Sequence, residues 1–388
     1  MNYNHPQIQK AVHIIHIVVG FLFCLFSFLY LWKVQGGVIG MAQHVLSGGQ
    51  TVYSPLVGAI VLTIALFVLQ KVLNRFFRLR RELYALSFFP SFLCMACLTD
   101  VAASAYSGIS MGGWKLGLPL AFVVFILFIL ILKRFPNCSN SHVGGVEVRL
   151  FLPNAISLLL LAIMTCVFSN TDEKIHQQYK IEYCLMNNDY EGALKVGKKS
   201  NQANKETTAL RAYALSKRNE LGEHLFEYPQ LYGSEGLLIP RADSVHMVFN
   251  PDSLYYALGA YPRYHKEPAM EFLTLLKQAP HQAIEPMAGE YYLCGLLLDK
   301  RLQEFVETLP DYYVMMDSVA LPHYYEEALV LYSRQGYYTE HLDSLLDSQY
   351  EKYDSIKVSA KNAKQAANLT MNDYQHTYWW YYDFANKK

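Results

Sequence analysis

The first 169 residues contain very few acids. Only Glu82, Asp100 and Glu147 are acidic there, against eleven Lys and Arg. The rest of the chain has the opposite balance, with thirty acidic residues against twenty-two Lys and Arg. Such an asymmetry indicates two environments, here lipid and water. The acidic second part also argues against nucleic acid as a partner, because phosphate binding requires clustered Lys and Arg.

Cysteine is scarce, and the spacing of the seven cysteines does not indicate a disulfide framework. Only Cys184 and Cys294 fall in the second part. They could pair outside the cytoplasm, although spacing alone cannot establish a disulfide. Cys94 and Cys97 have the spacing of a redox pair but lie within an apolar stretch. Packing between helices is the favoured interpretation for them, because a reactive pair needs access and a setting that stabilises a thiolate.

The chain also lacks the common motifs of catalysis and cofactor binding. It has no H-E-x-x-H, no P-loop and no G-x-G-x-x-G, so we expect no metal and no cofactor. Residues 108–112 match G-x-S-x-G, but in hydrolases that motif lies between a strand and a helix. Here it connects two apolar stretches, and the later apolar stretches contain no His that could activate Ser110. Residues 34–54 contain no acid, which argues against a polytopic glycosyltransferase that uses lipid-linked sugars.

Long apolar runs predict five membrane-spanning helices. The first run lies between Lys10 and Lys33; it can cross a hydrocarbon core of about 30 Å and is too long for a cleaved signal peptide. The predicted membrane domain is residues 1–170, with spans at about 11–32, 53–70, 83–105, 115–132 and 150–169. A Gly-rich connector of residues 36–54 joins the first two spans.

The distribution of cations predicts the orientation. With the N-terminus in the cytoplasm, the inside segments hold nine Lys and Arg, and the short outside segments hold only Lys33 and Lys115. A bias of this size in short loops is the condition under which the positive-inside rule is valid. We therefore expect a multi-pass protein of the cytoplasmic (inner) membrane, with residues 171–388 in the periplasm or outside the cell. Because neither Gly nor Pro occurs between Ala155 and Asn187, the fifth span is expected to continue into the soluble part as one helix.

The soluble part shows a helical repeat pattern. Asn188-Asp189-Tyr190 followed by Ala193 resembles the turn inside a tetratricopeptide repeat, and several segments loosely fit that family's W-x2-L-G-x2-Y pattern. These segments begin at Tyr179, Leu210, Tyr255, Tyr291 and Tyr325. The resemblance covers residues 171–350 and implies paired antiparallel helices stacked as an α-solenoid. The whole fold is therefore expected to be all-α, with five transmembrane helices followed by a TPR-like domain. As a whole, the chain resembles uncharacterised polytopic bacterial membrane proteins with a helical-repeat tail, grouped as families of unknown function.

Two details of the array are predicted as well. Residues 229–251 are rich in Gly, Pro, Asp and Ser and are expected to form an inserted loop. Gly295 is expected to permit close packing of its helix on the following helix, where Phe305 and Leu309 lie. The aromatic tail at residues 378–384 is expected to pack on the last repeat, with docking on the membrane surface as the alternative.

Tyrosine is the outstanding feature of the soluble part, with twenty-five of the thirty in the chain. The doublets suggest either rings buried between helices or a Tyr-lined concave surface that binds a protein, peptide or glycan. Both interpretations stay open at this point. The candidate binding residues are Tyr255, Tyr256, Tyr291, Tyr292, Tyr324 and Tyr325.

Asp100 is the one acid inside a predicted span, and such a residue is a functional candidate by default. Its place near the outer end of the third span also allows a hydrated carboxylate or a pair with Lys115. His13 and His16 share a helix face near the inner end of the first span, so a proton relay with Asp100 is not expected.

The expected function is that of a membrane protein whose exported TPR-like domain is a scaffold or binding module. The alternative is a membrane enzyme or transporter subunit that uses Asp100 and the outer loops. A cavity in which Asp100, His44 and Ser110 converge would favour this alternative.

Overall fold

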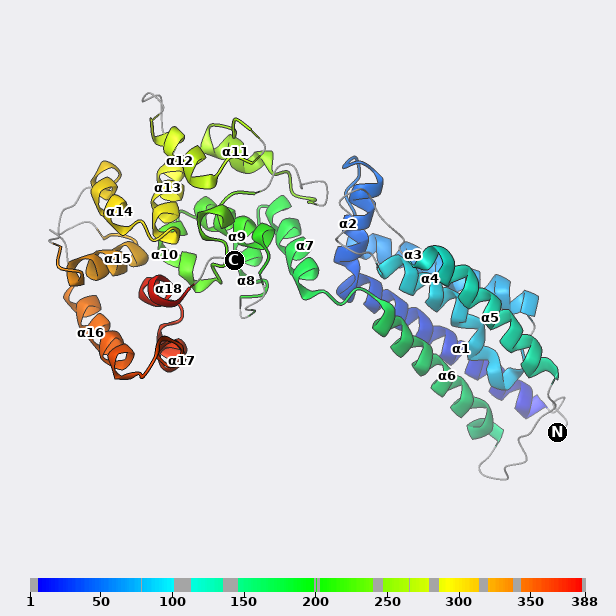
Figure 1. Ribbon diagram of the computed structural model, residues 1–388. Helices are drawn as coiled ribbons and strands as arrows, with labels where there is room; N and C mark the ends of the chain where they lie inside the picture. The colour runs from blue at the N-terminus through cyan, green and yellow to red at the C-terminus, as the bar shows by residue number, and fades with distance from the viewer. Residues whose placement is uncertain are drawn as a thin grey trace. The chain divides into compact units, whose positions relative to one another are not determined.

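The computed structural model describes residues 6–77, 79–100, 113–134, 146–198, 200, 203–239, 247–264, 266–278, 286–313, 320–337 and 343–385. Throughout these ranges every regular element is a helix, so the predicted all-α class is confirmed (Figure 1). The chain divides into two compact units, Met1–His176 and Gln177–Lys388. Each unit is described by itself.

The first unit is a bundle of long apolar helices. Among the described residues, five segments are long and apolar enough to cross a membrane, in agreement with the five predicted spans. In order, its elements are α1 (Pro6–Leu29), a π-helical turn (Tyr30–Val34), α2 (Gly36–Leu46), α3 (Pro55–Phe77), a 3-10 segment (Arg81–Phe88), α4 (Phe89–Thr99), α5 (Trp114–Arg134) and α6 (Val146–Phe168). Residues 36–46, expected to belong to a connector, instead form α2.

Buried polar side chains join the helices of this bundle. The Asn154 side chain on α6 accepts a hydrogen bond from the Ala85 N–H at 2.7 Å and donates to the Arg81 carbonyl at 3.0 Å. Gln70 on α3 donates to the Ser87 hydroxyl at 2.7 Å. In an apolar setting such bonds hold helices together because the polar groups have few other partners.

The expected continuous helix from the fifth span into the soluble part is wrong. α6 ends at Phe168, and α7 begins at Glu173. The Asn170 N–H donates to the Thr99 carbonyl at 3.0 Å, and the Gln35 side chain donates to the Asn170 carbonyl at 3.1 Å. The Asp172 side chain accepts from the Lys174 N–H, which starts the next helix. The backbone groups that would continue the helix are therefore used by local polar side chains and by the bundle.

The second unit consists of shorter helices and begins at Gln177, within the first of them. They are α7 (Glu173–Met186), α8 (Tyr190–Lys195), α9 (Lys205–Lys217), α10 (Leu221–His224), α11 (Asp252–Leu258), α12 (Ala269–Gln278), α13 (Pro286–Leu298), α14 (Leu302–Thr308), α15 (His323–Arg334), α16 (Ser344–Ser359), α17 (Ala363–Tyr374) and α18 (Tyr378–Phe384). One large apolar core runs through this unit from Ile181 to Tyr381.

Three of its helix pairs are joined by the same turn. Asn188, Asn219 and Lys300 each have a φ of 56° to 59°, in the left-handed region, and each follows a helix by two residues. In all three turns the N–H of the next residue donates back to a carbonyl near the end of the preceding helix. Asn tolerates this conformation better than most residues do, because its short polar side chain bonds locally.

The segment predicted as an inserted loop is part of the core. Its described residues contain no α-helix, only a single 3-10 turn at Gly233–Gly236. Leu237, Ile239, Met247 and Phe249 are nevertheless buried. The segment therefore fills space between helices.

The aromatic tail forms α18, which packs as expected on the helix of the last predicted repeat start, Tyr325 on α15, and also reaches back to the end of α13. Tyr378, Trp379 and Tyr381 are buried. The Trp379 indole donates to the Glu327 carbonyl on α15 at 2.7 Å, and the Tyr381 hydroxyl donates to the Leu298 carbonyl at the end of α13 at 2.7 Å. These three rings are therefore part of the apolar core. Docking on a membrane would instead require them on the surface.

Gly295 lies at a close helix approach, but the predicted partner is wrong. A Cβ added there would lie 2.6 Å from the Met270 sulfur and 3.4 Å from Leu273, both on the preceding α12. Phe305 is fully buried, and its ring contacts that of Tyr325. The repeat pattern thus correctly identified Gly295 as a residue at a close helix contact. It did not indicate that the neighbouring helix is α12.

Candidate functional site

Five of the six candidate tyrosines are core residues. Tyr255, Tyr291, Tyr292, Tyr324 and Tyr325 are each 6% exposed or less. These residues are therefore enclosed in the core and offer little surface to a ligand. Tyr256 is the exception, with 80% of its side chain exposed.

Tyr256 lines an open groove of about 780 Å³ in the second unit. The groove lies between the end of α9, the start of α11 and the residue Met287 on α13. Two further tyrosines, Tyr213 and Tyr261, contribute to it. The other lining residues are Ser216, Lys217, Asn219, Asn250, Asp252, Ser253 and Ala257.

Local turn chemistry positions these groups. Asn219 lies in the left-handed turn that connects α9 to α10. The Asn250 side chain accepts from the Asp252 N–H at 3.0 Å and so starts the turn into α11. Gly259, with a φ of 77°, ends α11, and Tyr261 then returns to within 6.0 Å of the Tyr255 ring. The rings and amides thus come from segments with well-defined ends.

The groove carries one cation and one acid. The Lys217 ammonium lies 5.5 Å from the centre of the Tyr213 ring, and burial raises the pKa of Tyr213 to about 12. Its phenol therefore stays neutral at physiological pH. With Lys217 and Asp252 balancing each other, the lining offers amide and hydroxyl groups with little net charge.

A buried glutamate supports the wall of the groove. Glu182 on α7 is 1% exposed and accepts hydrogen bonds from the N–H groups of Val248 and Phe249, directly before Asn250. Gln178 donates to its other oxygen at 2.8 Å. Burial raises the pKa of Glu182 to about 7, against the effect of these hydrogen bonds.

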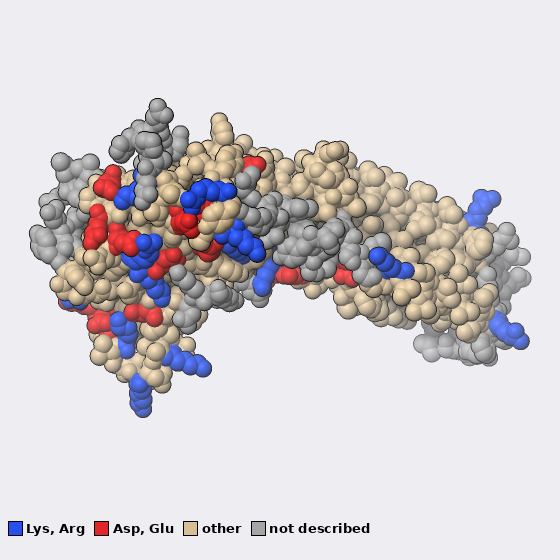
Figure 2. Space-filling model, turned by 45° about the horizontal axis from the view of Figure 1, so that its top comes forward, with Lys and Arg blue, Asp and Glu red and all other residues tan. Residues whose placement is uncertain are grey.

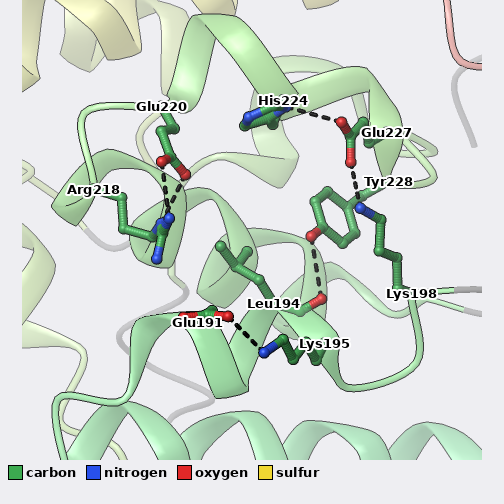
Figure 3. Close-up of polar contacts among 9 residues, drawn as sticks. All are labelled: Glu191, Leu194, Lys195, Lys198, Arg218, Glu220, His224, Glu227 and Tyr228. Carbon is green, nitrogen blue, oxygen red and sulfur yellow. Dashed lines mark hydrogen bonds and ion pairs between the residues drawn. The ribbon is translucent and has the colours of Figure 1, made fainter.

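Charged residues on the rest of this unit mostly neutralise one another. Figure 2 shows Lys, Arg, Asp and Glu interspersed over its visible face, without a large area of one sign. Around α8–α10, Arg218 forms a bidentate pair with Glu220, and Glu227 pairs with both Lys198 and His224 (Figure 3). Pairs as exposed as these contribute little stability. Because these side chains already pair with one another, they are less available to bind a charged ligand.

Asp100, the other candidate, ends α4 and is exposed. The Trp114 indole N–H donates to its Oδ2 at 2.6 Å, a partner that differs from both sequence alternatives, hydration and a pair with Lys115. Asp100 lies at an apolar cavity, which His44 does not line. Ser110 and the end of the predicted third span lie outside the described residues. His16 stacks on Tyr84 at the other end of the third span, far along the chain from Asp100.

The cysteines behave as packing residues. Cys94, Cys97, Cys184 and Cys294 are free, and Cys294 is buried beside the Tyr325 hydroxyl at 3.4 Å. Burial raises the pKa of Cys184 and of Cys294, which disfavours the reactive thiolate in both. Within the described ranges, no group of three or more His, Cys, Asp or Glu could hold a metal ion.

Sequence reasoning missed most of the groove. Tyr213, Lys217, Asn250 and Tyr261 come from segments that are neighbours only in the folded unit. Asn250-Pro251 is a turn motif, so it marked the start of α11. No local pattern indicated that this turn faces the end of α9.

Comparisons with known proteins support a family and supply no activity. Neither the curated proteins nor the solved structures gave a match. A family described as "Family of unknown function (DUF6057)" matches residues 104–262 and 263–385, which together cover well over half of the chain. The match extends from the third predicted span to the end of α18, and the chain belongs to this family.

Proposed function

We propose that the chain is a multi-pass protein of the cytoplasmic membrane whose C-terminal domain is an exported, TPR-like binding module. Five apolar helices and the nine-to-two bias of cations support the location, with the N-terminus inside. The recurring left-handed turns at Asn188, Asn219 and Lys300 support a repeat of helix pairs. The module would recognise a protein, peptide or glycan.

The open groove beside Tyr256 carries this proposal. Its volume is in the range of ligand sites, and it combines exposed aromatic rings with a few polar groups. Tyr provides a large contact area at a low entropic cost and is enriched at interfaces. Because Lys217 and Asp252 balance, an uncharged segment of a partner fits the groove better than a strongly charged one does.

The test is binding of the full chain, in detergent, to arrays of defined glycans and defined peptides. We expect a small set of uncharged ligands to bind the wild type and to be lost in Tyr256→Ala and in Asn250→Ala. Tyr337→Ala is the matched control, since Tyr337 is 53% exposed and lies outside the groove. Binding that survives in Tyr256→Ala and Asn250→Ala, or an absence of any binding, contradicts the proposed site.

A second function rests on Asp100. A membrane enzyme or transporter subunit needs a polar group at a cavity, and Asp100 does line one. The neighbouring lining is apolar apart from Trp114 and Thr165, which leaves Asp100 without an acid–base partner among the described lining residues. The binding module is therefore the better supported proposal.

A further inference from the structure

The cavity at Asp100 has the form of a site for a lipid chain. It measures about 520 Å³ and lies among α4, α5 and α6 of the first unit. Its walls are aromatic and aliphatic, formed by Phe89, Phe92, Leu93, Leu161, Met164 and Phe168. A volume of this size is typical of ligand sites.

Small residues on α5 keep the cavity open. Gly113, which directly precedes α5, and Gly117 and Ala121 on it recur every four residues and so share one face of the helix. In membrane bundles such a face usually allows a neighbouring helix to approach closely. Here a Cβ added to Gly113 or Gly117 would meet no atom within 4 Å. Among the described residues, this face therefore borders open space.

One end of the cavity is polar and negatively charged. Asp100 closes α4, Trp114 opens α5, and the 2.6 Å hydrogen bond between them joins the two helices. Asp100 is the one charged side chain among the described residues that line the cavity. Trp prefers the membrane–water interface, so this end is where a lipid headgroup would lie.

We propose that the cavity holds an acyl chain of a phospholipid whose headgroup is a primary ammonium, as in phosphatidylethanolamine. The ammonium would donate to the Asp100 carboxylate while the chain lies against Phe92 and Leu161. An anionic headgroup without an amine is disfavoured by the charge of Asp100, and a trimethylammonium has no N–H to donate. This inference rests on the membrane location proposed above.

The test uses the full chain in detergent, with equal amounts of phosphatidylethanolamine, phosphatidylcholine and phosphatidylglycerol that carry identical acyl chains. Native mass spectrometry then measures the lipids that are retained. We expect the wild type to retain phosphatidylethanolamine about fivefold over phosphatidylglycerol, which is the size of effect that an exposed ion pair supports. In Asp100→Asn, which keeps the shape and an acceptor for Trp114, this preference should disappear.

A second variant tests the cavity without altering the charge. Gly117→Leu should reduce the retention of all three lipids, because its side chain occupies the open space. Leu120→Ile is the matched control, since Leu120 lies on the same helix, is 64% exposed and does not line the cavity. Equal retention of the lipids by the wild type, or an unchanged preference in Asp100→Asn, overturns the inference. Recovery of the chain in the soluble fraction after membranes are washed at alkaline pH refutes the membrane location itself and is a separate result.

Discussion

The Glu182 carboxylate on α7 accepts a hydrogen bond of 3.0 Å from the backbone N–H of Phe249, which lies 67 residues further along the chain. The same oxygen accepts from Val248. One buried side chain thereby connects the first helix of the unit to the segment that enters the candidate groove at Asn250. Its protonation should therefore affect both the stability and the groove.

The stability of the protein should depend on the ionisation of Glu182. Its pKa of about 7 when folded exceeds the ordinary value of 4.5, so the folded state binds more protons between these values. The stability from this group is complete below pH 4.5 and is lost as the pH rises through 7, by about 3 kcal/mol in total. Urea unfolding of the wild type and of Glu182→Gln from pH 4.5 to 8 measures this effect.

We expect the stability difference between the wild type and Glu182→Gln to shift by up to about 1.4 kcal/mol per pH unit, in favour of the variant at high pH. The exposed Glu307→Gln serves as the control and should follow the wild type. Parallel curves for the wild type and Glu182→Gln would mean that this carboxylate does not titrate in the folded protein in this range.

Packing around α13 gives a second prediction. Gly295→Leu should overpack the contact with Met270 and cost about 1–3 kcal/mol. Phe305→Ala should open a cavity and cost about 3–5 kcal/mol. Gln303→Ala, on the exposed side of α14, should stay within about 0.5 kcal/mol. Thermal unfolding in detergent compares the three.

The new partner of Gly295 can be tested separately. If α12 is the helix it faces, Met270→Ala should relieve part of the loss in Gly295→Leu, because the sulfur that the new side chain meets is removed. The same change combined with Phe305→Ala should give no such relief. Simple additivity in both combinations would place Gly295 against a different helix.

The left-handed turns provide a third prediction. Asn188→Ala should cost about 1–2 kcal/mol, since Ala lacks the local hydrogen bonds that let Asn adopt a positive φ. Asn188→Gly should cost less, because Gly has no Cβ that opposes this conformation. Melting temperatures of the two variants rank them, and the opposite order would be inconsistent with the turn.

The proposed orientation can be tested in cells. A reporter that is active only in the cytoplasm should be silent when fused after Lys388. The same reporter fused after residue 78, in the basic connection that follows α3, should be active. Activity of the first fusion would reverse the orientation and place the second unit in the cytoplasm.

Periodicity was a good guide to elements and a poor guide to the site. The apolar runs predicted the five long helices because a helix buried in lipid must be apolar over its whole length. Tyr179, Leu210 and Tyr291, three predicted repeat starts, each precede a left-handed turn residue by nine positions. The apolar runs and the spacing of the turn residues depend on local sequence alone. They can therefore be recognised without knowledge of the tertiary structure.

The features that could not be predicted from the sequence depend on tertiary packing. The Tyr doublets gave no sign of which ring faces solvent, and only Tyr256 among the six candidates does. The groove needs the turn at Asn219 beside the turn at Asn250, and contacts such as Glu182 with Phe249 establish that neighbourhood. The break after α6 likewise arises because Thr99 and Gln35 bind the backbone of Asn170.

The position of α18 has a consequence for the synthesis of the protein. Tyr378 and Trp379 hydrogen-bond to Glu327, and Tyr381 bonds to Leu298, so the last helix contributes to the core of helices made much earlier. A nascent chain that has not yet received these residues leaves the buried Glu327 carboxylate and a gap in the aromatic core exposed. Folding of the second unit can therefore be completed only after residues 378–384 have been synthesised. A chain truncated before Tyr378 should therefore fail to complete this core and become sensitive to proteases.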